Sequence, residues 1–132
     1  IMDDFYREII LDHYKNPAQK GRLEDSNYAF EDENPLCGDF IHIDIKTNDQ
    51  GIITDAKFDG HGCAISMASA DMLLESLIGK TIDEAKKLTK QDILSMLGIE
   101  LSPVRLKCAL LPLKVVKAAL YELNEAGDEL ME

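Results

Sequence analysis

Four side chains in this sequence are of types that can hold a metal ion: Cys37, Asp39, Cys63 and Cys108. They are the three cysteines of the chain and an aspartate that follows the first of them by two residues. Three cysteines are too few, and odd in number, for a disulfide framework. In a reducing compartment they stay thiols, and thiols that lie together usually bind metal or perform catalysis. The chemistry of these thiols therefore depends on whether the fold brings the three cysteines together.

Length and charge narrow the classes of protein that the chain can be. It has 132 residues, 45% of them hydrophobic, and a formal net charge of −11, which predicts one globular domain over residues 1–132. Fourteen basic against 25 acidic residues disfavour nucleic acid as a partner. No apolar run approaches the roughly 20 residues that span a bilayer, and the acidic start lacks the basic end of a signal peptide. We expect a cytoplasmic protein that binds neither nucleic acid nor a membrane.

Two runs of alternating side chains predict the hairpin that must position the first two cysteines. Residues 40–46 alternate between isoleucines and polar residues, and residues 52–58 alternate again, with Ile52, Thr54, Ala56 and Phe58 expected on one face. The polar residues 48–51 between the runs are typical of a turn. Residues 27–33 give a weaker strand signal. Together with the helices below, these strands predict an α+β fold, an antiparallel sheet of about three strands covered by helices.

Helical spacing and capping residues predict the covering helices. A first helix is expected over residues 3–15, and a second, with an apolar stripe from Met67 to Ile78, stops before Gly79. Capping sequences then predict three further helix starts, at Thr81, Thr89 and Ser102.

The last long helix must accommodate a proline. Since proline is tolerated in the first turn of a helix but not in its interior, Pro112 predicts a start near Cys108. The apolar spacing continues to Leu123, and Gly127 is the expected end.

The register of the hairpin predicts that two cysteines meet. If the residues flanking the turn pair with each other, paired residue numbers sum to about 99 along the two strands. This register places Cys37 opposite Gly62, next to Cys63, and Asp39 opposite Gly60. Directly opposed residues have Cβ atoms about 4.5–5.5 Å apart. Two cysteines far apart in the sequence are therefore expected at one end of the sheet.

Cys108 can complete the site if its helix packs across the sheet. It lies at an expected helix start, where backbone amides favour a thiolate. Three thiolates and one carboxylate then make four ligands, a set that suits tetrahedral zinc or a two-iron cluster. A stable electron carrier would use four cysteines. We hypothesise that the oxygen of Asp39 weakens the site for reduced iron, which would help a cluster to leave.

Three ordered segments resemble the signature motifs of the IscU/NifU family of iron–sulfur cluster scaffolds. They are Asn34-Pro35-Leu36-Cys37-Gly38-Asp39, Gly60-His61-Gly62-Cys63-Ala64-Ile65-Ser66 and Val104-Arg105-Leu106-Lys107-Cys108. The resemblance implies an IscU/SufU-like α+β scaffold in which Cys37, Asp39, Cys63 and Cys108 bind a nascent [2Fe–2S] cluster or zinc. It also implies a cysteine desulfurase that delivers sulfur as a persulfide, and apo iron–sulfur proteins that accept the cluster. A scaffold of this kind has no catalytic turnover of its own.

Two departures from the family motifs leave the assignment of the chain to the IscU or the SufU branch open. Lys107 stands where IscU proteins carry histidine and is more like the SufU branch, whereas the SufU insertion between the second and third cysteines is absent. The persulfide acceptor implied by the resemblance is Cys108, or Cys37 as in zinc-type members. Lys107 could pair with Asp39, steady a persulfide, or simply be solvated. The Hsp70-type chaperone motif Leu-Pro-Pro-Val-Lys appears only as 101–105, Leu-Ser-Pro-Val-Arg, which does not support a chaperone partner.

Three other functions compete with the scaffold. A zinc-dependent SufU-type sulfur acceptor for a desulfurase is favoured by Lys107. A cysteine-nucleophile enzyme would need a base, for which His61 is the candidate near the thiols. A structural zinc module is disfavoured because closely spaced Cys-x-x-Cys pairs are missing. His13 and His42 are expected to be packed and partly exposed, respectively, without a role at the site.

Overall fold

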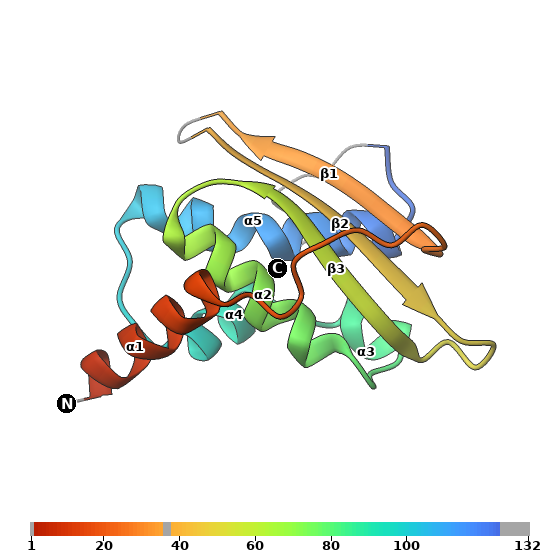
Figure 1. The fold of residues 1–132 in the computed structure, drawn as a ribbon, viewed down its shortest axis with the longest axis horizontal. Helices are drawn as coiled ribbons and strands as arrows, with labels where there is room; N and C mark the ends of the chain where they lie inside the picture. The colour runs from red at the N-terminus through yellow and green to blue at the C-terminus, as the bar shows by residue number, and fades with distance from the viewer. Residues whose placement is uncertain (1, 36–37, 125–132) are drawn as a thin grey trace.

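A three-stranded antiparallel sheet packs against two long helices in this computed structural model, which describes residues 2–35 and 38–124 (Figure 1). The strands lie in the order β1-β2-β3. Their bounds are Tyr28–Asn34 for β1, Asp39–Thr47 for β2 and Ile53–His61 for β3. The helices are α1 (Met2–Lys15), α2 (Ala64–Leu77), α3 (Ile82–Lys86), α4 (Lys90–Leu97) and α5 (Pro103–Leu120). The α+β prediction and its sheet of three strands are confirmed.

The core lies between the sheet and helices α2 and α5. Ile41, Ile43 and Ile45 of β2 are fully buried, as the alternating pattern predicts, and so are Ala56 and Phe58 of β3. Helices α2 and α5 cover this face of the sheet, and α1 packs along α2 on its far side from the strands (Figure 1). In the described residues, every helix is too short or too polar to cross a lipid bilayer. The two helices that carry cysteines are thus held firmly against the sheet.

The hairpin between β2 and β3 contains a bulge that shifts the expected register. Lys46 pairs with Asp55 but Thr47 pairs with Ile53, so Thr54 is an extra residue in β3. Thr54 is consequently exposed and Ile53 is buried, which makes the predicted face wrong at this end of the strand. The pairing beside the turn is also displaced by one residue, because the N–H of Asn48 donates to the carbonyl of Ile52 at 3.0 Å, where Thr47 was expected to pair with Ile52.

Together these two changes move the pairing by two residues. Gly60 pairs with Ile41, so the predicted pairing of Gly60 with Asp39 is wrong. Paired residue numbers sum to 101 rather than 99, as in the pair of Phe40 with His61. The predicted contact of Cys37 with Gly62 lies outside the described residues.

The long helix α5 differs most from its prediction. It begins at Pro103, after the N-cap Ser102, and runs through Pro112 without ending. The expected start near Cys108 is therefore wrong. Pro112 cannot donate to the carbonyl of Cys108, which costs a helix about 3 kcal/mol, but the surrounding turns are buried and the Ser69 hydroxyl donates to the next carbonyl, that of Ala109, at 2.7 Å. Tertiary packing outweighs the local preference.

The shorter helices follow their capping residues. Thr81 and Thr89 are the N-caps of α3 and α4, as predicted, and Gly98 is the C-cap of α4. Helix α2 ends before Gly79, although Ile78 at its end is exposed rather than packed. Helix α5 ends at Leu120 with Tyr121 as its C-cap, so the predicted end at Gly127 is wrong. The backbone leaves the helical region at Glu122, which adopts φ 55.

Candidate metal centre

Three of the four predicted ligands converge at one end of the sheet. Asp39 is the first residue of β2, Cys63 is the N-cap of α2, and Cys108 lies in the second turn of α5. One ligand atom from each of the three lies within 4.8 Å of the others. Asp39 and Cys108 are almost completely buried, and Cys63 is partly exposed. The fourth predicted ligand, Cys37, lies outside the described residues.

The Asp39 carboxylate is held in place by the start of α2. Its Oδ1 accepts the backbone N–H of Cys63 at 2.9 Å, and its Oδ2 lies 3.8 Å from the Cys63 sulfur. The hydroxyl of Ser66 lies 3.8 Å from the same sulfur and donates to the Cys63 carbonyl at 3.1 Å. These contacts fix the carboxylate and one thiol relative to each other before any ion arrives.

Gly62 makes this close approach possible. A Cβ atom at Gly62 would collide with the Asp39 carboxylate and would lie 2.7 Å from the Ser66 hydroxyl. At Gly60 the backbone adopts φ +143, and a Cβ atom there would collide with the carbonyl of Phe40. Glycine in this segment is therefore required by the space that the carboxylate and the neighbouring strand occupy.

Asn34 is a site residue to which sequence reasoning gave no role. It ends β1, pairs with Asp39 across the sheet, and its side-chain amide lies 4.0 Å from the Cys108 sulfur. The turn that follows it is closed by the Gly38 N–H donating to the Asn34 carbonyl at 2.8 Å. Pairing the weak strand 27–33 with the strand 40–46 would have placed Asn34 beside Asp39. The pairing of these two strands is therefore the sequence signal for Asn34.

The basic and imidazole side chains near the thiols lie outside the donor group. Lys107 is exposed, and within the described part of the chain no ion pair joins it to Asp39. His61 is exposed and lies beside the ring of Phe40, with ring centroids 6.0 Å apart. His42 is largely buried and is bonded to Glu31 and Asp44. It lies three residues after Asp39 and therefore on the opposite face of β2. Among the described residues, no histidine is hydrogen-bonded to Cys63 or Cys108. The hypothesis of a cysteine-nucleophile enzyme therefore gains no support.

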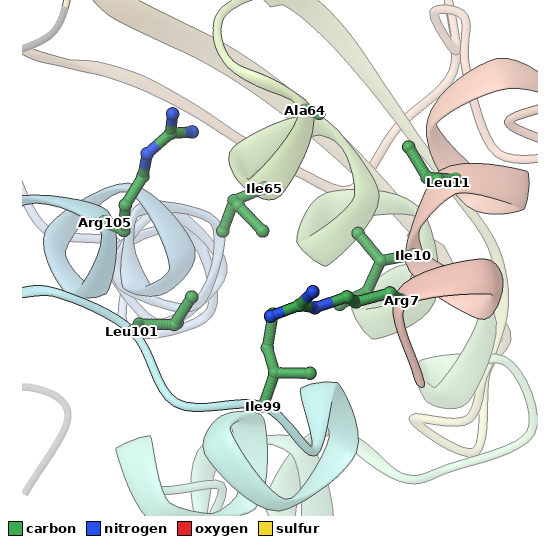
Figure 2. A pocket seen from close by; sticks show the side chains of 8 residues that line it. All are labelled: Arg7, Ile10, Leu11, Ala64, Ile65, Ile99, Leu101 and Arg105. Carbon is green, nitrogen blue, oxygen red and sulfur yellow. The ribbon is translucent and has the colours of Figure 1, made fainter. Parts of the chain in front are cut away.

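An apolar pocket of about 360 Å³ lies beside the donor group (Figure 2). It is bounded by α1, by Ala64 and Ile65 at the start of α2, and by the segment that leads into α5. Figure 2 shows Arg7 extending from α1 into the space between the helices, and Arg105 at the opposite rim. Ala64, which lines the pocket, directly follows Cys63, whose thiol is partly exposed.

The arrangement of ligands has the chemistry of a soft metal site. Thiolates prefer zinc, copper(I) or iron–sulfur clusters, and a carboxylate adds one harder ligand. Sulfurs from two helices and an oxygen from a strand come together on elements that the core holds rigidly. This geometry fits the donor set predicted from the sequence, as far as the described residues extend.

Comparison with known proteins identifies the family. A family model described as the NifU-like N terminal domain matches residues 5–128, nearly the whole chain. The chain belongs to this family. The IscU/NifU resemblance of the three cysteine segments is therefore confirmed.

Relatives of this NifU-like chain come from both branches that the sequence left open. The zinc-dependent sulfurtransferase SufU of Bacillus subtilis (strain 168) is 40% identical over an alignment that covers 96% of each chain. The iron–sulfur cluster assembly scaffold protein IscU of Escherichia coli (strain K12) is 38% identical, covering 89% of this chain and 92% of IscU. The SufU alignment spans 144 positions, more than the 132 residues here, so SufU contains residues that this chain lacks.

Solved structures share the fold. A putative iron–sulfur cluster assembly scaffold protein for the SUF system from Fervidobacterium islandicum AW-1 superposes with a TM-score of 0.75 at 33% identity, covering 86% of this chain and 94% of that one. The N-terminal part of a NifU-like protein from Brucella abortus, at 24% identity, superposes with a TM-score of 0.71 and covers 92% and 95% of the two chains. The NifU-like family and its fold are thus supported by sequence and by structure.

Proposed function

We propose that this NifU-like chain is an iron–sulfur cluster assembly scaffold, one domain over residues 1–132, that carries a [2Fe–2S] cluster as cargo. The observation that carries the proposal is the convergence of Asp39, Cys63 and Cys108 within 4.8 Å. Cys37 is the fourth ligand in this proposal. It precedes Asp39 by two residues, and two residues span at most about 7 Å. Four donors around one small volume match the ligand count of a two-iron cluster.

Sulfur reaches this site in the proposal as the outer sulfur of a desulfurase persulfide. The thiolate of Cys108 attacks that sulfur, a new S–S bond forms, and the old S–S bond breaks, which returns the desulfurase cysteine as a thiolate. Cys37 is the alternative acceptor. Cys108 is buried, so the transfer requires α5 or the neighbouring turn to open when the desulfurase docks. A reducing compartment, such as the cytoplasm, keeps the thiols available.

Assembly also requires electrons. Two ferrous ions, two sulfane sulfur atoms and two electrons give a cluster of two ferric ions and two sulfides, so an external reductant must supply the two electrons. In this proposal the chain supplies the ligands and the thiolate that accepts sulfur, but no electrons, and it has no turnover of its own. Apo iron–sulfur proteins then receive the cluster. The oxygen of Asp39 is the harder and weaker ligand for iron, which favours this release.

A zinc-dependent sulfur acceptor is the second candidate function. Two observations favour it: the 40% identity to SufU and the exposed Lys107 directly before Cys108. A lysine ammonium cannot ligate a metal, but it can stabilise a persulfide anion beside it. In this function zinc stays bound, and the chain passes sulfur on without building a cluster.

One reconstitution experiment separates the two functions. The protein is purified without oxygen, its bound metal is measured, and ferrous iron, cysteine, a cysteine desulfurase and a reductant are added while the visible spectrum is recorded. We expect a red-brown species with broad sulfur-to-iron charge-transfer bands. Cys63→Ser and Cys108→Ser should lose the charge-transfer bands. Asp39→Ala should release its cluster to an apo acceptor less readily than the unchanged protein. Asp49→Ala, in the exposed turn, should behave like the unchanged protein.

The other outcomes are equally informative. Stoichiometric zinc that iron does not displace, with faster desulfurase turnover, would favour the sulfur acceptor. A chain that binds neither zinc nor a cluster would contradict both functions. If Asp39→Ala or Asp39→Cys releases its cluster to an apo acceptor as readily as the unchanged protein, the role of the oxygen in release is wrong.

A further inference from the structure

A second group of possible metal ligands lies between α1 and α2, away from the thiols. His13 Nδ1 lies 2.6 Å from Asp71 Oδ2 and 3.8 Å from Glu75 Oε2. One ligand atom from each of the three side chains lies within 4.8 Å of the others. Asp71 follows Cys63 by eight residues, roughly 12 Å along a helix. The group is therefore distinct from the thiol site.

The Asp71 carboxylate is oriented by a residue outside the group. Asp71 is 1% exposed, and its Oδ1 accepts the backbone N–H of Gln19 at 2.8 Å. This leaves Oδ2 directed at His13. Carboxylates that ligate metals are typically fixed by such a hydrogen bond on their other oxygen. The orientation of Asp71 is thus set before an ion binds.

The third side chain, Glu75, leaves the group open to solvent. It lies four residues after Asp71 and so on the same face of α2. Its side chain is 59% exposed, whereas that of His13 is 21% exposed. An ion can therefore reach the imidazole nitrogen and the buried oxygen from the side of Glu75.

We propose that His13, Asp71 and Glu75 bind a divalent first-row transition-metal ion such as Fe²⁺, Co²⁺ or Mn²⁺. One imidazole nitrogen and two carboxylate oxygens form a harder donor set than thiolates, and water fills the remaining positions. An ionised Asp71 only accepts hydrogen bonds, so Nδ1 carries the hydrogen when the site is empty. A neutral imidazole carries a single hydrogen, so binding of the ion at Nδ1 moves that hydrogen to Nε2 by exchange with solvent, and no net proton is released. The net charge of −11 favours the approach of a cation.

Cobalt(II) tests this site on the whole protein. One equivalent of zinc is added first to fill the thiols, and Co²⁺ is then titrated while the visible spectrum is recorded. A nitrogen and oxygen site should give weak ligand-field bands without sulfur-to-cobalt charge transfer, at one Co²⁺ per chain. Glu75→Gln should weaken Co²⁺ binding at least about tenfold, because it removes an exposed ligand without touching the core. Glu8→Gln, an exposed residue of α1, is the matched control and should change nothing.

A second measurement excludes a merely structural role for the His13–Asp71 contact. Mn²⁺ should broaden the NMR signals of the His13 ring before those of His42 and His61, and Glu75→Gln should reduce the broadening. Cobalt that appears only with charge-transfer bands, or that binds equally to the Glu75→Gln variant, would overturn the proposal. Because the thiols hold zinc throughout, this failure would leave the scaffold function untouched. A chain that binds no zinc would instead take a second cobalt with charge transfer, which reports on the thiols alone.

Discussion

Helices α2 and α3 begin in two different ways. At α3 the hydroxyl of Thr81 accepts the N–H of Glu84 at 3.1 Å, and the Glu84 carboxylate accepts the N–H of Thr81 at 3.0 Å. Both bonds close within four residues. At α2 the N-cap Cys63 makes no side-chain cap, and its own N–H donates to Asp39, 24 residues earlier. One helix start is local, and the other depends on the sheet.

This difference separates a helix start with only a structural role from one that also belongs to the candidate metal site. A local cap stabilises its own helix and little else. The Asp39 carboxylate serves the start of α2 and also belongs to the donor group with Cys63 and Cys108. An ion bound there would tie β2, α2 and α5 together. Changes at Asp39 should therefore alter the stability that metal adds, whereas changes at Thr81 should alter stability equally with and without metal.

The largest expected effect comes from Asp39→Asn, which keeps an oxygen for the Cys63 N–H and removes the charge. At zinc roughly 1,000 times the Kd, binding adds about 4 kcal/mol to the free energy of unfolding. Loss of the anionic ligand should weaken zinc about a hundredfold, which leaves about 1.4 kcal/mol of that gain at the same zinc concentration. Urea unfolding with zinc and with a chelator measures the difference.

Asp49→Asn is the control for charge at the same hairpin. It removes one carboxylate from the exposed turn and should keep the whole zinc gain. If Asp39→Asn also keeps that gain, Asp39 supports the start of α2 but is not a ligand. The start of α2 would then be no more linked to metal binding than the start of α3.

The next effect is expected from Gly62→Ala. The added Cβ atom would collide with the Asp39 carboxylate and press on the Ser66 hydroxyl, so the carboxylate must move. Overpacking of this kind costs roughly 1–3 kcal/mol. We expect lower stability without metal and a smaller zinc gain as well. Gly79→Ala, where a Cβ atom meets nothing within 4 Å but the backbone has φ +94, should lower stability and keep the zinc gain.

The candidate ligands could be named from the sequence because the chemistry of a ligand is carried by its residue type. Three thiols, a carboxylate beside the first and three motif segments predicted Asp39, Cys63 and Cys108 as a group, and the structure brings these three together. The role of Asn34 was not predicted. Its amide reaches Cys108 only because β1 and α5 meet at this end of the sheet, and no local pattern reports that contact.

Elements were predicted well where local chemistry decides them and poorly where packing does. The capping residues Thr81, Thr89 and Ser102 located three helix starts within a residue. The bulge at Thr54 was missed because an extra residue leaves the alternating pattern nearly intact. The interior position of Pro112 was missed because proline propensity is a local rule, and burial of α5 against both α2 and the sheet outweighs it.

A smaller effect should follow Thr81→Ala, which breaks the local cap of α3. Loss of a threonine N-cap typically costs about 1 kcal/mol. The cost should be the same with zinc and with a chelator, because the hydrogen bonds of this cap stay within residues 81–84. Parallel urea titrations under the two conditions provide the test. A zinc gain that changed with Thr81→Ala would show that the two helix starts are coupled after all.

The smallest expected effect is the pH dependence of stability that comes from Glu84, the acidic residue of the same cap. Hydrogen bonds from the backbone and side chain of Thr81 lower the pKa of the Glu84 carboxyl below its ordinary value of 4.5. A lowered pKa in the folded protein means that the unfolded chain binds more protons in acid. The contribution of Glu84 to the free energy of unfolding is therefore present above about pH 4.5 and is lost as the pH falls below that value. Glu84→Gln retains an oxygen for the Thr81 N–H but does not titrate. The urea midpoint of the unchanged protein should therefore fall slightly more between pH 6 and pH 3.5 than that of Glu84→Gln. Asp83→Asn removes a neighbouring charge from the same turn, and an equal change in that variant would assign the effect to net charge rather than to the cap.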